Sequence, residues 1–138
     1  MIFLATQGVL MAALRAAGFV QLSIALANFT LPKQLRYREN LGRVTPIIRQ
    51  IFVVHSGYIV GILLLFAAIT LGFSSDLASG SGLGRFLSAS LALFWFCRIP
   101  VQLFYYDSDV RRANRVGDLA MSAALVFLSA TYAWAALA

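Results

Sequence analysis

Arg98 is a cation inside an apolar run that extends from residue 86 to residue 106. On an α-helix, the positions four, seven and eleven residues later share its face, and they hold Gln102, Tyr105 and Asp109. A guanidinium beside an amide and a phenol can bind an anion through charge-assisted hydrogen bonds. We therefore predict that Arg98, Gln102 and Tyr105 bind a ligand, on one polar stripe that ends at the cytoplasmic end of the helix.

Arg98 lies deep in this run, roughly 12 Å before its end at Tyr106 at about 1.5 Å per residue. A charge at bilayer depth costs about 2.5 to 3.5 kcal/mol on an insertion scale, so the guanidinium needs a partner. Pro100 has no backbone N–H for the carbonyl of Phe96, and it predicts a bend in the helix. That carbonyl is an alternative acceptor for Arg98, which would make the arginine structural.

Two other charged residues need partners within the apolar runs or at their ends. Asp118, near the cytoplasmic end of the last run, is the acid best placed to approach the stripe that begins at Arg98. Arg15 lies in the outer half of the first run, where a carbonyl or an outer-leaflet phosphate is the expected contact.

His55 is the one histidine of the chain, and it precedes Tyr58 by one helical turn. Imidazole is the usual general acid or base, so His55 is the candidate catalytic residue, and other catalytic residues stay unknown. A single histidine without a C-x-x-C-H motif could bind haem only with a ligand from another chain, so the cofactor is unknown. Cys97 is the one cysteine, which predicts a small buried hydrophobe and no metal site.

The elements that carry these residues are predicted to be membrane helices. Of the 138 residues, 61% are hydrophobic and 12% are charged, whereas a soluble domain has about 45 to 50% apolar residues. Each apolar run has close to the roughly 20 residues that cross the hydrocarbon layer. We predict an all-α membrane protein, a single domain over residues 1–138 with four transmembrane helices in one compact bundle, at residues 4–28, 51–73, 86–106 and 119–137.

The basic residues predict the orientation of the bundle. The connection between the first two spans and the connection between the last two are rich in lysine and arginine, whereas the middle connection has Arg85 beside it. The positive-inside rule places the two basic connections in the cytoplasm and both termini outside. We therefore interpret the net charge of +6 as topological, and we expect a multi-pass protein of the cell inner membrane with no nucleic-acid partner.

The first connection resembles that of the MAPEG proteins, small four-helix membrane enzymes of glutathione and eicosanoid metabolism. Arg36, Asn40 and Pro46 have their R-x3-N-x5-P spacing, and Arg98 followed by Tyr105 resembles the arginine and tyrosine of their later helices. The chain departs from the family where Arg43 replaces a glutamate. The resemblance implies a trimer with glutathione between subunits, Arg36 and Asn40 as ligand residues, and Arg98 stabilising a thiolate.

These observations favour two functions. The leading hypothesis is an accessory or scaffolding subunit of a larger membrane assembly, in contact with membrane lipids and with copies of itself or other subunits. The alternative is a MAPEG-like enzyme or a lipid-binding protein that holds an anionic ligand, a lipid or a molecule like glutathione, at a cytoplasm-facing site with His55 as acid or base.

Overall fold

Four long helices dominate the computed structural model, which describes residues 2–34 and 36–138. They are α1 (Ile2–Gln34), α3 (Pro46–Gly72), α5 (Gly82–Pro100) with its π-helical continuation η2 (Val101–Tyr105), and α7 (Arg115–Leu137). Within the described ranges, four segments are long and apolar enough to cross a bilayer: Thr6–Thr30, Pro46–Gly72, Gly82–Tyr105 and Arg115–Leu137. The predicted four-span helical bundle is confirmed, and the chain is a multi-pass membrane protein.

Short helices form the connections between the long ones. They are α2 (Tyr37–Asn40) and η1 (Leu41–Arg43) in the first, α4 (Ser74–Ala78) in the second, and α6 (Ser108–Ala113) in the third. α1 contains Pro32 and continues to Gln34. A proline in the last turn removes one backbone hydrogen bond from a helix that is about to end. In the middle connection, which is rich in glycine and serine, α4 buries Leu77 and Ala78 in the core.

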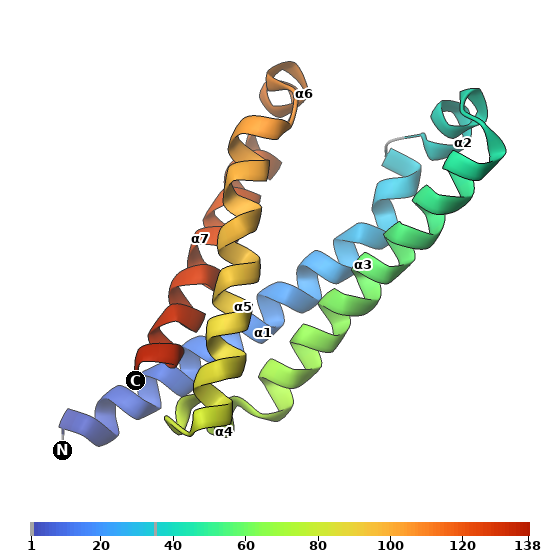
Figure 1. The fold of residues 1–138 in the computed structure, drawn as a ribbon. Helices are drawn as coiled ribbons and strands as arrows, with labels where there is room; N and C mark the ends of the chain where they lie inside the picture. Colours follow the sequence, from blue (N-terminus) through green and yellow to red (C-terminus); the bar gives the residue numbers. More distant parts are fainter. Residues whose placement is uncertain (1, 35) are drawn as a thin grey trace.

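The long helices form two hairpins. α1 packs along α3, and α5 packs along α7. Both termini and α4 lie at one end of the molecule, and the basic turns α2 and α6 lie at the other (Figure 1). We call these the outer end and the inner end, following the charge rule. Toward the inner end the α1–α3 hairpin and the α5–α7 hairpin diverge (Figure 1).

The hydrophobic core lies in the outer half, where all four long helices and α4 meet. Its fully buried side chains include Leu14, Leu77, Leu125 and Leu128. α1 approaches α3 closely at Gly18, where a Cβ atom would lie 2.6 Å from the side chain of Leu71. Small residues allow such close packing of membrane helices, in which van der Waals contact is a main source of stability.

A buried polar cluster joins three of the helices within this core. The hydroxyl of Thr70 on α3 lies 2.8 Å from the carbonyl oxygen of Phe66, and it shares a hydrogen bond of 2.6 Å with the hydroxyl of Tyr132 on α7. The amide oxygen of Gln21 on α1 lies 3.4 Å from the same threonine hydroxyl. Interhelical hydrogen bonds of this kind contribute about 0.6 kcal/mol each on average.

The inner half has almost no core. Among the side chains that the structure describes, none between residues 26 and 62 is buried. Between residues 96 and 124, Gln102 is the one described side chain that is buried. Cys97 is exposed as well, which corrects the expectation that it is buried. The two hairpins have already separated in this inner half, so most of the surface of each hairpin is exposed there. The residues predicted to bind a ligand all lie in this inner half.

Candidate functional site

Arg98 pairs with Tyr106 at the inner end of the α5–α7 hairpin. After Pro100 the helix continues as the π-helical turn η2, and the chain becomes extended at Tyr106. The tyrosine side chain therefore returns toward the helix, and its hydroxyl accepts a hydrogen bond from Arg98 Nη2 at 2.7 Å. The guanidinium carbon also lies 5.2 Å from the centre of the Tyr106 ring, within cation–π range.

The π-helical turn interrupts the predicted polar stripe. A π turn holds more residues than an α turn, so the side chains after it are displaced around the helix axis. Gln102 is buried, with 8% of its surface exposed. Tyr105 is 82% exposed, and its ring lies in an edge-to-face arrangement with that of Tyr106, with 6.3 Å between the ring centres. Asp109 lies beyond the helix end, in α6. The expectation that Arg98, Gln102, Tyr105 and Asp109 form one continuous face is therefore wrong.

Gln102 belongs instead to a polar clasp that joins α5 to α7, which consists of Gln102, Asp118 and Arg111. Gln102 Nε2 donates to Asp118 Oδ1 at 2.8 Å. Arg111 binds both carboxylate oxygens of Asp118, from Nε at 2.9 Å and from Nη2 at 3.0 Å. Its Nη1 donates to the carbonyl of Leu103 in the π-helical turn at 2.6 Å. The hydrogen bond to Asp118 raises the pKa of Arg111 above its usual value.

The clasp has a structural role that follows from its geometry. A bidentate arginine–carboxylate pair fixes both side chains in one plane, and here it connects the third connection to the beginning of α7. Arg111 also donates to the carbonyl of Leu103, which lies at a helix end, where carbonyls lack a backbone partner. The clasp therefore holds the π-helical turn in place and, with it, the approach of Tyr106 to Arg98.

Part of this arrangement follows from the amino-acid sequence. Asp118 does approach the lower part of the predicted stripe, through Gln102. The roles of Tyr106 and Arg111 were missed because each lies seven or eight residues from its partner. In a continuous helix that separation is about 10 to 12 Å along the axis, too far for direct contact. Pro100 inside an apolar helix was the available signal, since π-helical turns and kinks occur where such a proline removes a backbone hydrogen bond.

The structure places the remaining candidate residues on the other hairpin. Arg36 and Asn40 lie at the two ends of α2, where both are exposed. Arg36 has a left-handed backbone conformation, with φ 47°, and its side chain pairs with Glu39 at 3.7 Å. His55 is exposed on α3, and no hydrogen bond or ion pair in the described part of the chain joins it to Arg98.

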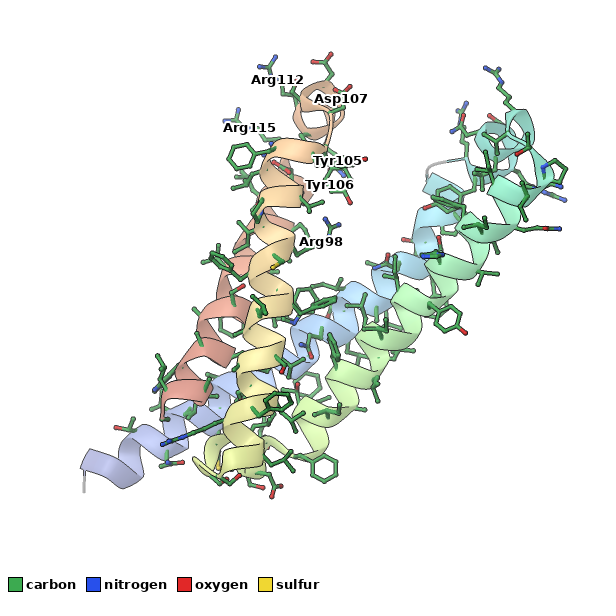
Figure 2. The ribbon with its side chains drawn as sticks, in the orientation of Figure 1. Arg98, Tyr105, Tyr106, Asp107, Arg112 and Arg115 are labelled. Carbon is green, nitrogen blue, oxygen red and sulfur yellow. The ribbon has the colours of Figure 1, made fainter. Side chains whose placement is uncertain are left out.

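The two candidate groups therefore do not meet within one chain. Figure 1 shows α2 and α6 at the tips of diverging hairpins, and Figure 2 shows Arg98, Tyr105 and Tyr106 on the side of α5 that faces the other hairpin. In the described ranges, no three histidine, cysteine or acidic side chains gather as metal ligands would.

Neither a family model, nor a curated protein, nor a solved structure matches this chain. The similarity of the first connection to MAPEG proteins stays a prediction.

Proposed function

We propose that this multi-pass protein of the cell inner membrane binds the anionic headgroup of a phospholipid in the cytoplasmic leaflet. The observation that carries the proposal is the placement of Arg98. Arg98 lies within the apolar span and is only partly buried. It is on the side of α5 that faces the α1–α3 hairpin (Figure 2).

The contacts of Arg98 leave most of its binding capacity unused. A guanidinium has several N–H donors arranged in a plane that matches phosphate oxygens. In the described part of the chain, its one hydrogen bond goes to Tyr106, and no acidic side chain pairs with it. Tyr106 accepts one hydrogen bond from the guanidinium and lies within cation–π range of it, without neutralising its charge. An anion is therefore the ligand that would complete this site.

The depth of the site favours a lipid headgroup over a soluble anion. Tyrosine is common at the membrane interface, where its ring is apolar and its hydroxyl contacts water. Tyr106 follows the end of η2 and is 43% exposed, as expected at this boundary. Arg98 extends toward it, as arginine side chains do when they reach the headgroup region from within the bilayer. Phospholipid phosphates occupy that region.

A second function is supported by a different observation, the exposure of α3. Only 11% of the most apolar window of this span is buried, compared with 33% for α1. His55 and Tyr58 lie on its exposed inner half. An accessory subunit that packs other membrane helices against α3 would cover these polar side chains, which are costly toward lipid.

The test is native mass spectrometry of the full chain released from nanodiscs of phosphatidylcholine that contain phosphatidylglycerol as the probe. We expect at least one retained phosphatidylglycerol in the wild type. Arg98→Gln should reduce retention about fivefold, since one basic residue near the surface contributes on the order of 1 kcal/mol. Arg98→Lys keeps the positive charge, so its phosphatidylglycerol retention should fall less than that of Arg98→Gln. Arg85→Gln is the control, because it removes the same charge at the outer end.

Each outcome assigns the site. Equal retention in wild type and Arg98→Gln contradicts the lipid proposal. Protein partners at fixed stoichiometry, purified from the native membrane and lost on substitution of Ile59 by Trp on α3, support the subunit function instead. A homotrimer that retains glutathione, lost in Arg98→Gln, would support the MAPEG resemblance.

A further inference from the structure

An open depression of about 600 Å³ lies where α6 meets the beginning of α7. Its lining residues are Ser108, Arg111, Arg112, Arg115 and Asp118. The lining thus combines guanidinium groups with a hydroxyl and one carboxylate. Its volume falls within the range of about 300 to 1,000 Å³ that is common for ligand sites.

The clasp neutralises part of this lining. Asp118 accepts hydrogen bonds from Arg111 with both carboxylate oxygens, so its charge is compensated and it does not repel an incoming anion. Arg111 in turn uses its donors on Asp118 and on Leu103. These two residues form a fixed wall of the depression rather than a binding group.

The remaining lining is cationic and accessible. Arg112 and Arg115 are exposed, and no ion pair or hydrogen bond holds either side chain within the described residues. Ser108 is exposed beside them. Two guanidinium groups and a hydroxyl offer the planar donors and the charge that phosphate oxygens accept.

The acidic residues of the same connection do not line the depression. Asp107 accepts a hydrogen bond from the backbone N–H of Asp109 at 2.7 Å, which ties it to its own turn. Figure 2 shows Asp107 on the side of α6 toward the other hairpin, and Arg112 and Arg115 on the opposite side. The depression therefore also lies apart from the Arg98 site, and each can be removed without the other.

We propose that this depression binds a phosphate monoester group, with Arg112, Arg115 and Ser108 as its ligands. A phosphate monoester carries about −1.5 to −2 charges near pH 7, which matches two unpaired arginines better than the single charge of a phosphodiester does. The inner end of the spans lies at the headgroup level, so phosphatidate is one source of the group. A soluble phosphate monoester from the cytoplasm is the other.

The experiment is hydrogen–deuterium exchange of the full chain in phosphatidylcholine nanodiscs. Three conditions are compared with phosphatidylcholine alone: added phosphatidate, added phosphatidylglycerol, and soluble glycerol 3-phosphate. We expect slower exchange over residues 106–118 with phosphatidate, and a weaker effect with phosphatidylglycerol. Protection by glycerol 3-phosphate alone would identify the soluble source of the same group.

The double variant Arg112→Gln with Arg115→Gln should raise the phosphatidate fraction that gives half of the protection by about 30-fold. The figure follows because each of the two lost basic residues contributes on the order of tenfold or less to binding near the membrane surface. Arg43→Gln with Arg49→Gln is the matched control, since it removes the same charge at the inner end of the other hairpin. Exchange in the core segment 125–135 reports whether each variant is folded. An equal effect in both double variants, or no protection by any phosphate monoester, overturns the proposal, whatever the result at Arg98.

Discussion

At the scale of single residues, the inner end of the α5–α7 hairpin shows two ways to satisfy a charge near a membrane boundary. Asp118 is satisfied within the chain, by Arg111 and Gln102. Arg98 is held by a tyrosine that leaves its charge uncompensated. The first arrangement maintains the fold, whereas the second leaves binding capacity for a group from outside.

Asp118→Asn tests the structural role of the clasp. The amide cannot accept both hydrogen bonds from Arg111, and it leaves that guanidinium without a counter-charge. We expect the thermal midpoint of unfolding in detergent to fall by a few degrees, and amide exchange over residues 101–106 to become faster. The control is Asp109→Asn, on an exposed side chain outside the clasp. An unchanged midpoint in Asp118→Asn would show that the clasp does not stabilise the hairpin.

At the scale of elements, the contact between α1 and α3 depends on a missing side chain. A Cβ atom at Gly18 would lie 2.6 Å from Leu71, whose side chain would have to move. Gly61 has open space at the same position. Close approach of the helices, rather than polarity, therefore decides how α1 and α3 pack at this level.

Gly18→Leu should destabilise the protein by about 1 to 3 kcal/mol, the usual cost of overpacking, whereas Gly61→Leu should be nearly neutral. Unfolding followed by steric trapping in bicelles measures both. Adding Leu71→Ala to Gly18→Leu should recover part of the loss, because it removes the side chain that the new leucine meets. Equal effects at the two glycines would refute the close-contact explanation.

At the scale of the whole molecule, the core lies in the outer half and the charged connections lie at the inner end. Both termini share the outer end with α4 (Figure 1), as an even number of spans requires. The diverging hairpins leave the inner half accessible from the surrounding membrane. Both sites proposed above lie at this accessible end.

The orientation predicts the outcome of a reporter fusion after Ala138. Alkaline phosphatase, which is active outside the cytoplasm, should be active there, and a fluorescent protein that matures in the cytoplasm should be dark. A fusion inserted after Arg112 should give the opposite pair of results, because α6 lies at the basic inner end. If the fluorescent protein fused after Ala138 is bright and the phosphatase is inactive, the orientation is the reverse of the predicted one and both anion sites lie outside.

The sequence by itself determined the four spans, and it predicts the side on which the basic connections lie. Long apolar runs must form helices in lipid, where backbone groups have no water to bind, and arginine distribution orients them. It also indicated that Asp118 would approach the Arg98 stripe. Only the tertiary structure decided that Tyr106 meets Arg98, that Arg111 closes the clasp, and that His55 and Arg36 lie apart from both. These depend on a π-helical turn after Pro100 and on the divergence of two hairpins, and neither follows from regular helical spacing.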